Sequence, residues 1–80
     1  MNTLIDTPAK AAYAEGIVEI TMNSGDLLRF PVAENPRLSR GTQAELTEIE
    51  LSPFGVHWPL LDEDLSIRRI AAGDYGQGKG

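Results

Sequence analysis

The chain has 80 residues, enough for one small domain, and its 41% apolar and 24% charged residues are typical of a folded globular protein rather than a disordered, collagenous or coiled-coil chain. It contains no cysteine, which excludes disulfides, thiolate zinc ligands and thiol nucleophiles. Twelve Asp and Glu against seven Lys and Arg give a net charge of −5, which disfavours direct binding of nucleic acid or anionic lipid. Without an apolar run of ~20 residues or a secretory signal, the sequence predicts a cytoplasmic protein with no membrane partner.

The first fifteen residues carry weak structural signals. Thr7 is a possible helix cap with Pro8 at the first helical position, and Lys10 begins a short run of helix formers. The run lacks an apolar face wide enough to dock on a core. We therefore expect residues 1–15 to form an N-terminal arm, weakly ordered or a frayed short helix, and order to begin at Gly16.

A β-hairpin is expected next. Residues 17–22 and 27–32 each alternate apolar and polar side chains, which predicts two strands with one buried face each. The polar run 23–26 between them contains Gly25, which can take the positive φ of a turn. Because Pro31 has no N–H, the second strand is expected at a sheet edge or a bulge.

Short helical turns are expected between residues 36 and 46, bent at Gly41. Asn35, which is followed by a proline, can cap the first turn. Thr42 and Glu45 fit a capping box, in which each side chain accepts a hydrogen bond from the other residue's backbone N–H.

The remaining segments predict a second hairpin and a last helix. Residues 47–51 and 56–58 alternate on either side of a Pro-Phe-Gly turn. Residues 66–72 form a helical pattern that Ser66 can cap and a glycine can end. Residues 74–80 are glycine-rich and are expected to form a flexible tail.

Together these elements predict an α+β domain over residues 16–73. Its order is ββ-α-ββ-α, with a mostly antiparallel four-stranded sheet and short helices.

The acidic run Asp62-Glu63-Asp64 invites comparison with a calcium loop. The spacing fails, because the loop needs glycine where Ile67 stands and glutamate where Gly73 stands. Acids just before a helix also interact favourably with its dipole, at ~0.3–1 kcal/mol each. We therefore expect a capping and surface role for them, and no metal site.

Arg68 and Arg69 stand just past these acids and can pair with them, form a binding spot or be a solvated surface. Arg37 and Arg40 lie three residues apart and can bind an acidic partner or be a solvated surface. Charged side chains of both signs suit a protein contact more than a catalytic centre. The predicted partner-binding surface consists of Arg37, Arg40, Asp62, Glu63, Asp64, Arg68 and Arg69.

His57 is the only histidine, and no serine stands beside it in the context of a nucleophile elbow. We therefore predict no catalytic residue, no enzymatic activity and no cofactor, and expect His57 on a half-exposed strand face. Trp58 is expected in the core because its neighbours are apolar. If the domain holds a small ligand, the pocket is expected at His57 and Trp58.

Four segments then resemble one known family. They are Phe30-Pro31-Val32, Asn35-Pro36-Arg37-Leu38, Gly55-Val56-His57-Trp58-Pro59, and Leu61-Asp62-Glu63-Asp64-Leu65-Ser66-Ile67 continuing to Gly73. In this order and spacing, over roughly residues 17–73, they resemble the bacterial family called domain of unknown function 2442. The chain departs from that pattern at Gly41 and at Arg68-Arg69-Ile70-Ala71.

The resemblance implies a small α+β domain that occurs alone or fused to a helix-turn-helix. It also implies a gene beside that of another small protein, an arrangement similar to toxin–antitoxin pairs. It carries over no catalytic residue.

We expect a protein–protein interaction or regulatory module, antitoxin-like, whose partner is another small protein or a second copy of the chain. The alternative is a small-ligand sensor related to the domains fused to helix-turn-helix regulators. A hydrolase or nuclease that uses His57 with Asp62 and Asp64 is the least favoured of the three.

Overall fold

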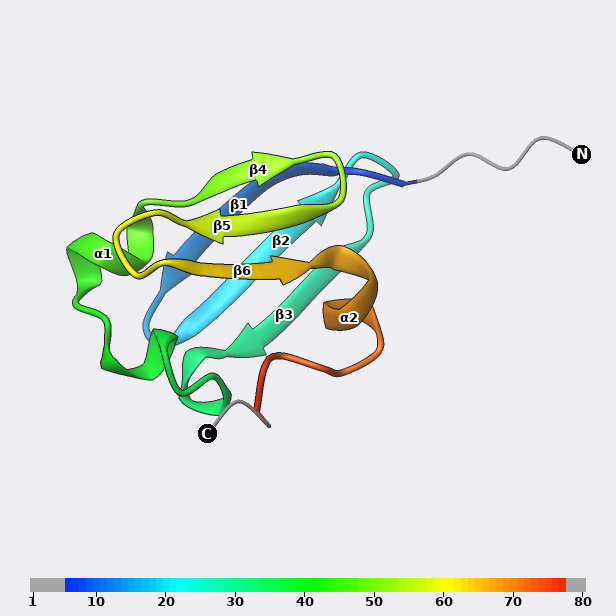
Figure 1. Cartoon of the computed structure of the whole chain (residues 1–80). Coiled ribbons are helices and arrows are strands. Elements are labelled where there is room, and N and C mark those ends of the chain that lie inside the picture. Colours follow the sequence, from blue (N-terminus) through cyan, green and yellow to red (C-terminus); the bar gives the residue numbers. More distant parts are fainter. Residues whose placement is uncertain (1–5, 78–80) are drawn as a thin grey trace, which may run out of the picture.

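The first half of the chain builds one three-stranded antiparallel sheet. In the computed structural model, which describes residues 6–77, the strands β1 (Pro8–Ala14), β2 (Ile17–Met22) and β3 (Leu27–Pro31) lie in the order β1-β2-β3 (Figure 1). The predicted hairpin is confirmed as β2 and β3, and its second strand lies at the sheet edge, as the proline indicated. Alternation buries one face of β2 completely.

The strand β1 corrects the prediction for the N-terminal segment. The expectation of a weakly ordered arm or frayed helix over residues 1–15 is wrong for residues 8–14, and residues 1–5 lie outside the described part of the chain. Glu15 and Gly16, with φ of 50° and 85°, make a two-residue turn of the kind whose twist matches antiparallel strands. Pairing with β2, continuous from Lys10 to Ala14, outweighs the helix preference of alanine.

Short helical turns connect the two halves of the chain. They are the 3₁₀ turns η1 (Val32–Glu34) and η2 (Leu38–Arg40), followed by α1 (Gln43–Thr47). Those predicted at residues 36–46 are confirmed as η2 and α1, whereas η1 was not predicted. The capping box is confirmed: Thr42 Oγ1 accepts from the Glu45 N–H at 3.2 Å, and Glu45 Oε1 accepts from the Thr42 N–H at 2.9 Å. These turns are anchored by buried leucines, which ties the connection to the core.

The second half builds another three-stranded sheet, so the prediction of a single four-stranded sheet in a ββ-α-ββ-α order is wrong. The strands β4 (Glu50–Ser52), β5 (Gly55–Trp58) and β6 (Glu63–Ser66) pair antiparallel in the order β4-β5-β6. The predicted second hairpin is β4 and β5. The strand β6 was not predicted, because its acidic residues are also typical of the residues before a helix.

The predicted last helix is present as α2 (Ile67–Ala71). Ser66 caps it, with its Oγ accepting from the Arg69 N–H at 3.1 Å.

Among residues 6–77, no helix has the length and apolarity needed to cross a bilayer.

The core lies between the two sheets, which face each other in Figure 1, with β4 beside β1. Trp58 is fully buried at 0% exposure, as predicted for a core residue, and its Nε1 donates to the Leu46 carbonyl at 3.2 Å. Its ring meets Phe30 edge-on, at 6.5 Å between ring centres. The buried apolar residues are Val18, Ile20, Met22, Phe30, Val32, Leu38, Leu46, Val56, Trp58, Leu65 and Ile70.

The segment after α2 closes the sandwich on the β3 side. In Figure 1 this orange and red segment runs back past the end of β3. Tyr75 stacks on Phe30, with 4.9 Å between ring centres, and Gly76 is buried. The expectation of a flexible tail over residues 74–80 is therefore wrong for residues 74–77, while 78–80 lie outside the described residues. We call residues 72–77 the C-terminal strap.

Candidate functional site

Charge is divided unequally along the chain and between the two sheets. Residues 41–67, which hold α1 and the whole second sheet, contain six Asp and Glu and no Lys or Arg. The rest of the chain has six acids and seven bases. The second sheet and α1 therefore carry the negative charge of the molecule, whereas the other parts are close to neutral.

A row of charged side chains crosses the outer face of the second sheet. The strand register places Glu50, His57 and Asp64 side by side on β4, β5 and β6. His57 Nδ1 lies 2.6 Å from Asp64 Oδ1, with the two side chains 34% and 80% exposed. His57 thus occupies the half-exposed strand position that was predicted. The contact with Asp64 orients the His57 ring on the outer face of the second sheet.

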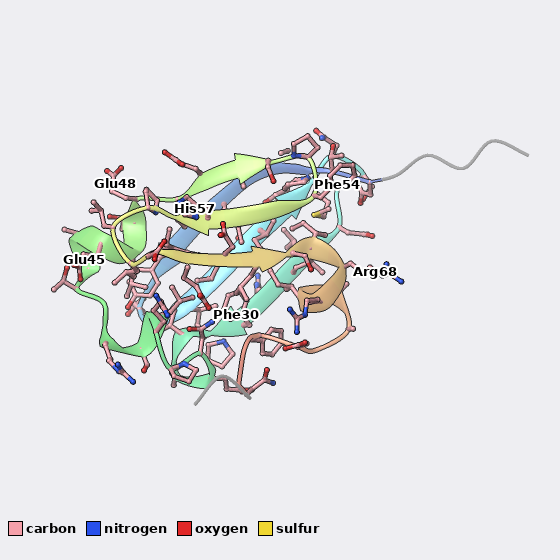
Figure 2. All side chains as sticks on the ribbon, viewed as in Figure 1. Phe30, Glu45, Glu48, Phe54, His57 and Arg68 are labelled. Carbon is pink, nitrogen blue, oxygen red and sulfur yellow. The ribbon has the colours of Figure 1, made fainter. Side chains whose placement is uncertain are left out.

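Figure 2 labels two further acids, Glu45 and Glu48, together with His57. Glu45, Glu48 and His57 lie towards the α1 end of the molecule, whereas Phe54 and Arg68 lie at the opposite end. We call Glu48, Glu50 and Asp64, all exposed, the acidic face. It has no arginine or lysine within the second sheet to neutralise it.

The three acids of residues 62–64 have three different environments, and the expectation that all three act as surface caps of the last helix is wrong. Asp62, with φ of 52°, lies in the turn before β6 and is exposed. Glu63 faces inward and is buried, and its Oε2 accepts from Asn35 Nδ2 at 2.7 Å. Asp64 faces outward to His57. Glu63 and Asp64 are residues of β6 and Asp62 precedes it, so none of the three lies in the first turn of α2, where an acid would interact favourably with the helix dipole.

Arg37 is the one predicted arginine that the structure brings to these acids. Its Nη1 donates to the Asp62 carbonyl at 3.2 Å and lies 3.9 Å from the Asp62 carboxylate. Its Nε lies 3.8 Å from Glu63 Oε1. These contacts place Arg37 in a structural bridge at the α1 end of β6.

The other predicted arginines lie elsewhere, so the seven residues do not share one patch. Arg68 and Arg69 belong to α2, at the far end of β6, and Arg69 Nε donates to Asp74 Oδ2 at 2.9 Å. Arg40 ends η2 and is exposed. The predicted mixed-charge surface is thus divided between the two ends of the second sheet.

Asn35 forms a buried polar junction. A capping role was predicted for it, but its contacts with Glu63 and Tyr75 were not. Asn35 Oδ1 accepts from the N–H groups of Arg37 and Leu38 at 3.0 and 2.9 Å, at the start of η2, whose N-cap is Arg37 and not the predicted Asn35. Its Nδ2 also donates to Glu63 Oε2 and, at 2.8 Å, to the Tyr75 carbonyl. No local pattern indicates these two partners, because they lie 28 and 40 residues away in the sequence.

A ligand pocket, if the domain has one, was expected at His57 and Trp58. Two hollows lie on the described surface, and neither is lined by these residues. One, of about 900 Å³, lies between the β4–β5 turn and α2 and is lined by Phe54, Ile67 and Arg68 among others. The other, of about 510 Å³, lies on the outside of the first sheet. Trp58 has no exposed surface for a ligand to touch. Among residues 6–77, no group of three or more His, Asp or Glu is placed to hold a metal ion.

Comparison with known proteins gives a family and two similar structures. A family described as "Protein of unknown function (DUF2442)" matches residues 8–76. A crystal structure of a protein of unknown function from Rhodospirillum rubrum ATCC 11170 is similar at a TM-score of 0.82 and 28% identity, covering 92% of this chain and 94% of that chain. The solution NMR structure of the uncharacterized protein CV0863 from Chromobacterium violaceum is similar at 0.79 and 26%, covering 91% and 71%. No curated protein matches.

Proposed function

The chain belongs to the DUF2442 family of proteins of unknown function, and from that premise we propose that it is a protein–protein interaction module which binds a basic partner on its acidic face. The observation that carries this proposal is the concentration of negative charge in residues 41–67.

The acidic face suits a partner that is positively charged. Its carboxylates are exposed, two of them on the strands β4 and β6 and that of Glu48 at the end of α1, and together they create a negative potential. Such a face accelerates encounter with a basic protein and excludes acidic ones. It also repels phosphate, so the partner is a protein rather than a nucleic acid.

The partner in this proposal is another small protein, and the module is the antitoxin-like or regulatory half of such a pair. A single domain of this size has a small accessible surface, so one sheet face is a large fraction of the surface that a partner can contact. His57 contributes a polar, partly exposed ring at the centre of the row, next to Asp64.

The test compares two variants that lose the same amount of charge. Each tagged protein is used to capture partners from its native host at low salt, and the dissociation constant of any stoichiometric small basic protein is then measured by calorimetry. The tag is placed at the N-terminus, away from the C-terminal strap. The acidic-face variant carries Glu48→Gln, Glu50→Gln and Asp64→Asn, and the control variant carries Glu15→Gln, Asp26→Asn and Glu34→Gln.

We expect the acidic-face variant to bind about tenfold more weakly at low salt, since three exposed charges contribute about 0.5 kcal/mol each. The control should bind like the wild type, and the difference should shrink as salt is added. Equal weakening in both variants would mean that net charge, and not this face, attracts the partner. Unchanged binding in the acidic-face variant, with the fold intact, would reject the proposal.

A further inference from the structure

The outer face of the first sheet is a second surface with a different chemistry. We infer that two copies of this chain associate through it, with the two first sheets face to face. This inference is independent of the proposed function, because the acidic face lies on the other side of the sandwich.

The strand register arranges the outward side chains of the first sheet in three rows. Residues on either side of them in each strand point into the core, which fixes which positions face outward. Each row takes one residue from β1, one from β2 and one from β3. The rows are Ala14, Ile17 and Pro31; Ala12, Glu19 and Arg29; and Lys10, Thr21 and Leu27.

Much of this face is apolar and exposed. The first row has no polar side chain, and its Ile17 is 39% exposed. In the third row Leu27 is 51% exposed. Ala12 and Ala14 end at Cβ, and over them lies the open hollow of about 510 Å³ bounded by Glu19 and Arg29. A sheet face that stays in water normally presents polar side chains at these positions. An apolar patch with a polar rim is typical of a protein contact.

The charges on this face favour a second copy as the occupant. The middle row places Glu19 beside Arg29, at 2.6 Å, and the face carries one further charge, on Lys10. A surface with both signs side by side is complementary to itself, because in a two-fold contact each Glu19 can meet the other copy's Arg29. This contact also keeps the acidic residues of the two second sheets on the far sides, where the repulsion between two acidic chains is least.

The size of the face sets the strength of the association. Three strands and five residues span about 10 Å by about 14 Å between Cα positions, so each copy contributes about 400–500 Å² with its side chains. The two copies together would bury about 800–1,000 Å² of surface. A stable protein–protein interface usually buries at least about 1,200 Å². The dimer is therefore weak, and forms at high protein concentration.

The first test is dilution of the wild-type protein from about 1 mM to about 10 µM, followed by sedimentation and by amide chemical shifts. We expect the apparent mass to fall towards 8.7 kDa on dilution. The shifts that change should lie on Ala12, Ala14 and Ile17, and those of His57 and Asp64 should stay constant. A chain that remains monomeric at about 1 mM, or shifts confined to the second sheet, would overturn the inference.

Charge reversal gives the second test. Glu19→Arg and Arg29→Glu should each abolish self-association, because each places like charges opposite each other in the two-fold contact. An equimolar mixture of the two variants should associate at least as well as the wild type, since every pair across the contact is then opposite in sign. The control Glu50→Arg, on the other sheet, should self-associate as the wild type does. A mixture that stays monomeric while the wild type dimerises would place the contact elsewhere.

Discussion

Asn35 is the residue whose replacement tests the packing of this fold most directly. Its side chain has no exposed surface and makes four hydrogen bonds, to Arg37 and Leu38 at the start of η2, to Glu63 in β6 and to Tyr75 in the C-terminal strap. The substitution Asn35→Ala therefore removes one small group that joins three separate parts of the chain.

The expected loss of stability follows from these four contacts. Each hydrogen bond between neutral groups contributes about 1 kcal/mol, and the bond to the Glu63 carboxylate about 1.5–3 kcal/mol. Leu38 and Glu63 are buried and Tyr75 is half-buried, so water replaces their lost bonds poorly. The total of about 4.5–6 kcal/mol is a large part of the free energy of unfolding expected for 80 residues, which is about 4–12 kcal/mol.

The assay is urea unfolding followed by the fluorescence of Trp58, which is buried and is the only tryptophan. Asn23→Ala is a matched control, because the Asn23 side chain is exposed and its Nδ2 donates to Thr7 Oγ1 alone among the described residues. The control should lose less than about 1 kcal/mol. If Asn35→Ala loses no more than Asn23→Ala, the junction does not stabilise the domain as argued here.

Two further predictions concern backbone positions and use the same unfolding assay. Gly76→Ala should destabilise the domain by about 2–3 kcal/mol, because φ is 87° and the new Cβ would lie 2.8 Å from Asn35 Nδ2. Gly25→Ala, at φ of 100° with open space around it, should cost only about 1 kcal/mol; equal losses would show that the close approach is unimportant. Thr42→Ala should cost about 1 kcal/mol through loss of the capping box, and an unchanged midpoint would contradict that role.

The parts of the fold that the sequence predicted are those with local signals. The alternation of β2 and β3 is visible within each strand, and the caps of α1 and α2 depend on residues three apart. Trp58 has apolar neighbours, which placed it correctly in the core. For the candidate site, the half-exposed position of His57 followed from alternation in the same way.

The parts that failed depend on contacts between distant residues. The alanines of β1 prefer a helix, and only pairing with β2 makes them a strand. The acids of β6 suit a helix start, and only the pairing of Leu65 with Val56 aligns them as a strand. The burial of Glu63 depends on Asn35, and the hollow over the first sheet depends on three strands at once. The outer face of the first sheet was therefore not predicted, because it forms only when β1, β2 and β3 pair with one another.

The C-terminal strap has a consequence for how the chain folds during synthesis. Domains fold as their residues emerge, N-terminal part first. Here the ring that stacks on Phe30, and the carbonyl that satisfies Asn35, both belong to Tyr75. On the ribosome, the two sheets can pack together, with Phe30 against Trp58, before Tyr75 emerges to cover the ring of Phe30 on the β3 side. The domain completes its core only after residue 76 has been released.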